Sequence, residues 1–143
     1  NIVKTFIIPL MVLIVSSTGE VNTENQNMKI EYDITSGSVN SFTSDTNTTS
    51  LIINITTPED GTLKAILPRN IIDSTYNEDN DIFYILIDGE EIDFKETITK
   101  DFRTLEIPYV KGSQILEIIG TTSINSLETI DFDWLSKLEY INV

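Results

Sequence analysis

Apolar and polar side chains alternate along most of this chain, and turn signals interrupt the alternation at short intervals. Ile30, Tyr32 and Ile34 alternate with charged residues, which is the period of a half-buried β-strand. The same period returns, more weakly in the first case, at 39–43, 51–56, 63–67, 92–95 and 102–108, and the segment at 114–119 closes the domain before Gly120. Strands at this spacing predict an all-β fold, an antiparallel β-sandwich of about seven strands.

Two Asp-Gly pairs mark the clearest turns. Asp88-Gly89 predicts a tight hairpin, because glycine readily takes the positive φ that such turns require. Asp60-Gly61 predicts an earlier hairpin between the strands at 51–56 and 63–67. The unbroken apolar run at 82–87 predicts a central strand that is covered on both sides.

The composition narrows the choice of partners. The chain has 143 residues, of which 40% are hydrophobic, and 23 acids against 9 bases give a net charge of −14. The apolar fraction suffices for one hydrophobic core and argues against global disorder. Recognition of phosphate groups needs a basic surface, so we expect neither nucleic acid nor an anionic membrane surface as a partner.

The sequence contains no Cys and no His. Disulfides are therefore absent, and packing alone must hold the domain together. Thiol catalysis, histidine acid–base catalysis, the serine triad and ordinary zinc sites are excluded in their usual forms. Carboxylate pairs and Ser–Lys chemistry remain open, but we expect a protein that is not an enzyme.

Residues 1–19 have the order of a secretory signal peptide. Lys4 precedes an apolar run at 6–15, and small residues follow at 16–19. A membrane-spanning helix needs roughly 20 apolar residues, so this run has the length of a signal peptide instead. We expect cleavage near Ser17 or Gly19, a secreted or cell-surface location, and no direct membrane span after cleavage. In the alternative, the segment is retained and pairs with a sheet edge of another subunit in a filament.

The remaining boundaries follow from changes in composition. Residues 20–27 are polar and predict a linker, and residues 28–121 hold the sandwich domain. The tail at 122–143 has a different period, with Ile124, Leu127, Trp134, Leu135, Leu138 and Ile141 at intervals near three and four. Residues 131–142 therefore fit a short amphipathic C-terminal helix that packs on the sandwich or docks on a partner, and 138–143 fit a strand equally well.

Six stretches between residues 30 and 121 resemble a module of exported proteins from ammonia-oxidising archaea. These stretches are 32–39 (Tyr-Asp-Ile-Thr-Ser-Gly-Ser-Val), 60–63 (Asp-Gly-Thr-Leu), 67–73 (Leu-Pro-Arg-Asn-Ile-Ile-Asp), 86–93 (Leu-Ile-Asp-Gly-Glu-Glu-Ile-Asp), 103–108 (Arg-Thr-Leu-Glu-Ile-Pro) and 117–121 (Glu-Ile-Ile-Gly-Thr). The resemblance implies an immunoglobulin-like sandwich at the cell surface and carries over no catalytic residue. Such proteins usually continue into a Pro-Glu-Phe-Gly sorting motif and a membrane anchor, where this chain has the tail with Trp134.

A weak calcium motif lies in an acidic loop. Its alternating oxygen-bearing residues are Asn77, Asp79 and Asp81. An EF-hand also needs Gly at the sixth position and Glu at the twelfth, and this chain has Ile82 and Asp88 there. A solvated loop is therefore the favoured interpretation. Calcium is the one cofactor left open, with Asp73 or Asp101 as further ligands, and no other cofactor is expected.

A second acidic group surrounds the predicted hairpin turn. Its members are Asp88, Glu90, Glu91 and Asp93. Two carboxylates about 5–10 Å apart are the catalytic pair of glycosidases, but nothing in the sequence predicts a cleft that would hold one of them protonated. We interpret the group as turn chemistry and as a charged edge that blocks strand pairing.

Two N-glycosylation sequons occur, Asn47-Thr48-Thr49 and Asn54-Ile55-Thr56, and the second lies on the polar face of its strand. Aromatic residues on or beside predicted strands are expected in the core rather than on a sugar-binding face, and they are Phe83, Tyr84, Phe94, Phe102 and Tyr109. Tyr76 is the loop candidate for such a face.

Together these patterns predict an exported, acidic, non-catalytic glycoprotein module with a structural, adhesive or assembly role at the cell surface. Its expected partners are proteins or glycans of that surface. The alternatives are a glycan- or calcium-binding module and a filament subunit assembled by strand exchange.

Overall fold

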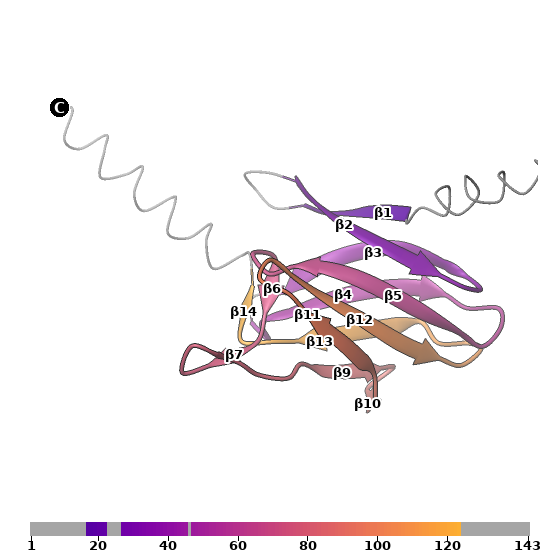
Figure 1. Cartoon of the computed structure of the whole chain (residues 1–143). Helices are drawn as coiled ribbons and strands as arrows, with labels where there is room; N and C mark the ends of the chain where they lie inside the picture. The colour runs from indigo at the N-terminus through magenta and orange to yellow at the C-terminus, as the bar shows by residue number, and fades with distance from the viewer. Residues whose placement is uncertain (1–16, 23–26, 46, 124–143) are drawn as a thin grey trace, which may run out of the picture.

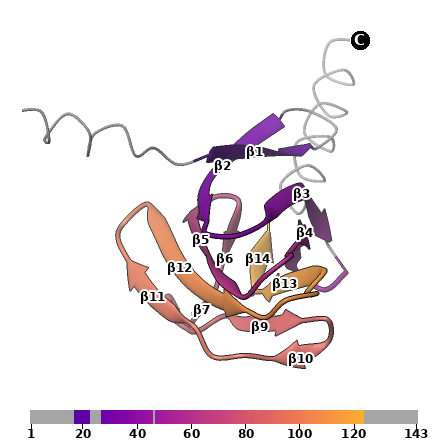
Figure 2. The same ribbon diagram turned by 90° about the vertical axis from the view of Figure 1, so that its right-hand side faces the viewer.

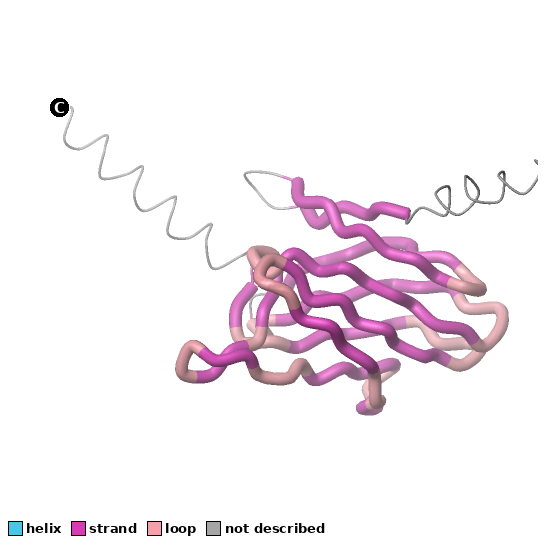
Figure 3. The backbone as a smooth tube through the Cα atoms, in the orientation of Figure 1, coloured by secondary structure: helices cyan, strands magenta, loops and turns pink. Residues whose placement is uncertain are grey.

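The computed structural model describes residues 17–22, 27–45 and 47–123, and this part of the chain is all β without a helix (Figure 1 and Figure 3). The longer strands are β1 (Ser17–Asn22), β2 (Asn27–Ile34), β3 (Ser38–Asp45), β4 (Ser50–Thr56), β5 (Gly61–Pro68), β9 (Tyr84–Ile87), β11 (Lys95–Ile98), β12 (Phe102–Tyr109) and β13 (Ile115–Ile119). Two-residue strands are β6 (Ile72–Asp73), β7 (Thr75–Tyr76), β8 (Asp79–Asn80), β10 (Glu90–Glu91) and β14 (Thr122–Ser123).

Ten of these strands form two antiparallel rows that face each other, which confirms the predicted β-sandwich. One row has the order β10-β9-β13-β4-β3 and the other the order β1-β2-β5-β12-β11. Strand β1 joins the rows, because it pairs with β2 along its whole length and with β3 through the single parallel pair Val21↔Phe42. Figure 2 shows the rows curving around a shared interior. The ten strands exceed the seven or so that the sequence predicts.

The connectivity is a series of four arches that lie side by side. The chain crosses from one row to the other between β2 and β3, β4 and β5, β10 and β11, and β12 and β13. Each arch joins two strands that lie in opposite rows, and the four short crossings lie toward one end of the sandwich (Figure 1). The opposite end holds the longest connection, residues 69–83, which joins β5 to β9 and carries β6, β7 and β8.

The core fills the space between the rows with alternate side chains of each strand. Its members include Ile53 and Ile55 of β4, Leu63 and Leu67 of β5, Ile85 and Ile87 of β9, Leu105 and Ile107 of β12, and Leu116 and Ile118 of β13. Burying one such side chain stabilises the fold by about 1.5–3 kcal/mol. Since the chain has no Cys, no disulfide supports this apolar packing.

Two expectations about strand pairing are wrong. Strands β4 and β5 do not form a hairpin around Asp60-Gly61, because they lie in opposite rows and bury their apolar faces against each other. The run at 82–87 is not a central strand covered on both sides, because β9 pairs with β13 on one side and only with the short β10 on the other. Its outward side chains Ile82 and Tyr84 are exposed.

The Asp88-Gly89 hairpin is confirmed, although it is shorter than predicted. Asp88 has φ 50° and Gly89 has φ 88°, the geometry of a two-residue turn with both central residues in the left-handed region. Pairing with β9 ends at Glu91, and residues 92–94 then cross to β11 in the other row. Ile92 and Phe94 therefore pack on the core from a connection rather than from a return strand.

The domain begins before the predicted boundary. Residues 20–22 and 27 were expected in a linker but belong to β1 and β2, because backbone pairing between two strands does not require apolar side chains. Strand β1 also contains residues 17–19 of the predicted signal peptide, whose residues 1–16 lie outside the described part. Thr122 and Ser123 of the predicted tail form β14, and the expected C-terminal helix lies outside the described residues. The described residues contain no helix that is long and apolar enough to cross a membrane.

Candidate functional site

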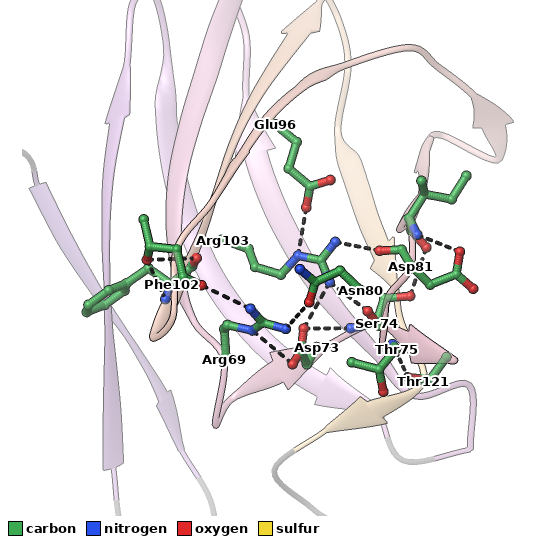
Figure 4. Close-up of polar contacts among 12 residues, drawn as sticks. Arg69, Asp73, Ser74, Thr75, Asn80, Asp81, Glu96, Phe102, Arg103 and Thr121 are labelled. Atoms are coloured by element: carbon green, nitrogen blue, oxygen red, sulfur yellow. Dashed lines mark hydrogen bonds and ion pairs between the residues drawn. The ribbon is translucent and has the colours of Figure 1, made fainter. Parts of the chain in front are cut away.

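Side-chain hydrogen bonds and ion pairs attach the segment 69–83 to the rest of the domain. It leaves β5 after Pro68, passes through β6 and the β7–β8 hairpin, and enters β9 (Figure 1). Two arginines, Arg69 and Arg103, hold it against the end of the sandwich (Figure 4). These are the only arginines in the sequence.

Arg103 projects from β12 into the core, where its side chain is 0% exposed. Its Nε donates to Glu96 Oε2 at 2.8 Å, and its Nη1 donates to Asp73 Oδ1 at 2.9 Å and to the Ser74 carbonyl at 2.7 Å. Its Nη2 donates to the Asp81 carbonyl. Four hydrogen bonds thus satisfy most of the five N–H donors of a guanidinium group, as burial of a charge demands.

The ring of Phe83 supports the same guanidinium group. Arg103 Cζ lies 4.6 Å from the ring centroid of Phe83, within the range of a cation–π contact. Phe83 is itself buried and comes directly before β9. One side chain of β12 therefore contacts three parts of the 69–83 segment, namely Asp73 with Ser74, Asp81, and Phe83.

Asp73 links the two arginines. Its Oδ1 accepts the bond from Arg103, and its Oδ2 accepts a bond from Arg69 Nε at 3.0 Å. Arg69 also donates through Nη1 to the Thr99 carbonyl at 2.9 Å and through Nη2 to Asn80 Oδ1. The turn between β11 and β12 is thereby tied to the same cluster.

The pKa of Asp73 reflects this arrangement. Burial on its own raises the pKa of this carboxyl, but hydrogen bonds from Arg103, from the backbone N–H of Ser74 and from Arg69, together with the Arg69 charge, outweigh burial. The net effect holds the pKa of Asp73 below the ordinary value for an aspartate. Asp73 is therefore ionised, and paired, at neutral pH.

The absence of a side chain at Gly120 allows residues 120–123 to pack closely against the 69–83 segment. A Cβ at Gly120 would lie 2.3 Å from the Asp73 carbonyl oxygen and 3.0 Å from the Phe83 ring. With no side chain in the way, Thr121 N–H donates to the Asp73 carbonyl at 2.9 Å, and Thr121 Oγ1 accepts from Thr75 N–H at 2.9 Å. Strand β14 then pairs with β6.

The fixed segment presents an exposed hairpin. Asn77 and Glu78 form the turn between β7 and β8, with φ values of 53° and 72°. Tyr76 at 70%, Ile82 at 65% and Tyr84 at 55% are among the most exposed large apolar side chains of the described residues. The arrangement combines a buried ionic anchor with an outward, partly aromatic surface, and we call residues 76–84 the display segment.

The weak calcium residues Asn77, Asp79 and Asp81 all lie in the display segment and are exposed. Asn77 occupies the left-handed turn, and Asp81 uses Oδ1 to accept from Ile82 N–H and its carbonyl to accept from Arg103. Within the described ranges, no three acidic side chains are arranged to hold a metal ion. Calcium binding at this loop stays a hypothesis.

The acidic hairpin group is spread over the turn and its surroundings. Asp88 Oδ1 accepts from Ile115 N–H at 2.8 Å and so fixes the start of β13. Glu90, Glu91 and Asp93 are exposed, the first two on the short edge strand β10. These positions agree with the interpretation that Asp88 stabilises the turn and that the exposed acids place charge on the edge strand, where it discourages pairing with other strands.

The two sequons occupy different settings. Asn47 is exposed in the connection between β3 and β4. Asn54 lies on the outer face of β4, half-buried, and its Nδ2 donates to Ser41 Oγ at 2.9 Å. Whether either carries a glycan stays a prediction.

The aromatic residues divide between core and surface. Phe83 and Tyr109 are buried and Phe94 packs against the core, as expected. Tyr84 and Phe102 were also expected in the core, but both are exposed, because they alternate out of phase with the inward side chains of β9 and β12. Tyr76 is exposed, as a loop aromatic should be.

Sequence reasoning missed the two arginines. Arg103 has the same parity in its strand as Leu105, Ile107 and Tyr109, so the alternation that predicted the strand also places Arg103 inside. This every-second-residue pattern was the signal from which the burial of Arg103 could have been predicted. Comparison with known proteins gives no match, whether to a family model, a curated protein or a solved structure.

Proposed function

We propose that this chain is an exported, non-catalytic β-sandwich module with a structural, adhesive or assembly role at the cell surface, where it contacts a protein or a glycan. The observation that carries the proposal is the display segment, an exposed hairpin locked onto a rigid scaffold through Arg69, Asp73 and Arg103. Binding residues are concentrated on loops that a rigid scaffold positions. Tyrosine is also enriched where proteins meet their partners.

The charge of the segment indicates what it would contact. Glu78, Asp79 and Asp81 follow Tyr76 in the same segment and are exposed, so an anionic partner is repelled. A partner surface that is neutral or basic fits. The export part of the proposal rests on the signal-like order of residues 1–19.

The test has two independent arms. In the first, the native protein is located by cell fractionation and its intact mass is measured, and we expect an envelope or extracellular fraction and loss of residues near the start of the chain. A cytoplasmic location with an unprocessed mass would overturn the export proposal.

In the second arm, the labelled full chain is added to envelopes of its own source cells. We expect saturable binding that Tyr76→Ala weakens several-fold. Val110→Ala is the matched control, because Val110 is 66% exposed but lies in the arch between β12 and β13 at the other end of the domain. Equal binding by both variants would refute the role of the display segment, and an absence of saturable binding would refute adhesion.

A further inference from the structure

A polar groove crosses the outer face of the sandwich at the arch end of β4. Its volume is 460 Å³, and its floor is formed by residues 54–57. Asn40 lies on one wall, and the connection 112–114 with Ile115 lies on the other. Small-molecule sites commonly measure about 300–1,000 Å³, so the groove can take a mono- or disaccharide.

A β-bulge builds the first wall. Between β3 and β4, Val39 pairs with Ile55 and Ser41 pairs with Asn54, so Asn40 is the extra residue that has no partner position. A bulge of this kind re-aims side chains and is frequent beside binding sites. Here Asn40 Nδ2 donates to Thr56 Oγ1 at 3.0 Å, while Asn54 Nδ2 donates to Ser41 Oγ at 2.9 Å. Each bond uses one amide hydrogen and leaves the second hydrogen and the amide oxygen for a ligand.

Backbone and hydroxyl contacts fix the opposite wall. Gly112 N–H donates to the Thr57 carbonyl at 2.9 Å, and Thr57 Oγ1 donates to the Ser113 carbonyl at 2.8 Å. Ile55 N–H donates to the Gln114 carbonyl at 2.9 Å, which leaves the exposed Gln114 side chain at the rim. The positive φ of Gly112, 88°, allows the tight turn that these bonds require. The groove is thus preformed.

The groove differs from the rest of the surface in its charge. None of the residues that line it is charged, although the chain carries 23 acids and 9 bases. An anion would find no counter-ion among these residues and is repelled by the net charge of −14, whereas the neighbouring Asp88 carboxylate already accepts from the N–H groups of Gln114 and Ile115. Amide and hydroxyl groups both donate and accept hydrogen bonds, as sugar hydroxyls do. Ile115 and Pro58 add apolar contact for the C–H face of a sugar ring.

From these features we propose that the groove formed by Asn40, Asn54, Thr56 and Gln114 binds a neutral carbohydrate. The site is separate from the display segment, because it lies at the other end of β4, so failure of either proposal leaves the other standing. Two sources of the sugar share this chemistry. One is a glycan of another molecule, and the other is a glycan attached to Asn54 Nδ2 of the chain itself, since the sequon lies in the floor of the groove.

The first experiment uses the full chain, produced with ¹⁵N in a host that lacks N-glycosylation. It is titrated with methyl glycosides of glucose, galactose, mannose and N-acetylglucosamine, with methyl glucuronide as the charged comparator, and is applied to an array of neutral oligosaccharides. We expect amide shift changes confined to residue 40, 54–57 and 112–115, and a Kd of about 1 mM or below, which corresponds to a binding free energy of about −4 kcal/mol. Methyl glucuronide should bind less well.

Variants decide whether the groove is responsible. Asn40→Ala removes one amide from the wall and should weaken binding about three- to tenfold, the usual effect of one neutral hydrogen bond. Gln114→Ala tests the opposite wall in the same way. Asn70→Ala is the matched control, because Asn70 is exposed near the start of the 69–83 connection at the far end of the domain. Spectra of each free variant verify that the fold is intact.

The proposal is overturned if no neutral sugar shifts these amides, if Asn40→Ala binds as tightly as Asn70→Ala, or if the glucuronide binds equally well. A second arm separates the sources of the sugar in a protein that passes these tests. Glycopeptide mapping of the native protein shows whether Asn54 is occupied. If Asn54 carries a glycan and the amides that shift in the titration are also shifted in the glycosylated protein, the sugar in the groove is the chain's own glycan. If Asn54 carries no glycan, the sugar belongs to another molecule.

Discussion

Replacement of Arg103 by methionine tests the ionic anchor most directly. Methionine has a similar length and keeps the contact with Phe83, but Asp73 and Glu96 lose their shared partner, and the carbonyls of Ser74 and Asp81 lose a donor. Removing one partner of a buried ion pair costs about 3–5 kcal/mol. The two carboxylates are 15% and 14% exposed and can recover little hydration, so we expect a loss within that range.

Chemical denaturation of wild type and variant measures this loss. A domain with a free energy of unfolding of about 5–15 kcal/mol would lose a large share of it. The midpoint should fall while the slope stays constant, and the melting temperature should drop by roughly 12–20 °C, at about 4 °C per kcal/mol. Lys95→Met is the control, because Lys95 is exposed on the neighbouring strand β11, and it should change stability by less than about 0.5 kcal/mol.

The reasoning fails if Arg103→Met costs under about 1 kcal/mol, since that is the value of an exposed ion pair. A double-mutant cycle with Asp73→Asn gives a second check. The two residues are in direct contact, so the combined loss should fall short of the sum of the single losses by at least about 0.5 kcal/mol. Additive losses would show that the two groups act independently.

Three further predictions concern the same end of the domain and the arches. The pKa of Asp73 is lowered in the folded state, so its contribution to stability is complete above the unfolded value of 3.8 and is lost as pH falls below it. Asp73→Asn should therefore reduce the fall in the free energy of unfolding that is measured between about pH 5 and pH 2. An unchanged dependence on pH would contradict this. Gly120→Ala places a methyl group 2.3 Å from the Asp73 carbonyl oxygen and should lower the free energy of unfolding by about 1–3 kcal/mol in denaturant melts. The new methyl group of Gly89→Ala meets nothing within 4 Å, so this variant should lose only about 1 kcal/mol, because of the positive φ at that position. Equal losses would exclude a steric clash at Gly120. Tyr109→Phe removes the hydroxyl that donates to the Ser36 carbonyl and accepts from Ser36 N–H at 3.2 Å, so it should lower stability by about 1–2 kcal/mol, and a neutral result would show that water replaces these bonds.

The sequence predicts most of the strands because their signal is local. Alternation of side chains every second residue identifies β2, β4, β5 and β12, and Asp88-Gly89 identifies its turn, since both depend only on neighbouring residues. Strand β1 was missed because its pairing with β2 relies on the backbone and leaves little trace in the composition.

The candidate site was less predictable, because its parts are far apart in the chain. Asp73 and Arg103 are 30 residues apart, and only the fold brings them to 2.9 Å. The groove was likewise missed, since a bulge at Asn40 and a turn at Gly112 have no joint signature in the sequence.

What the sequence determines by itself is the class of structure and the chemistry that is missing from it. Alternation gives an all-β domain, and a chain without Cys or His must be held by packing and cannot use the usual thiol, histidine or zinc chemistry. The tertiary structure decides which strands meet. The same alternation in β4 and β5 is compatible with a hairpin or an arch, and the choice depends on whether their apolar faces share one row or oppose each other across the core. That choice depends on contacts between distant residues, and the same contacts bury Arg103 and form the groove.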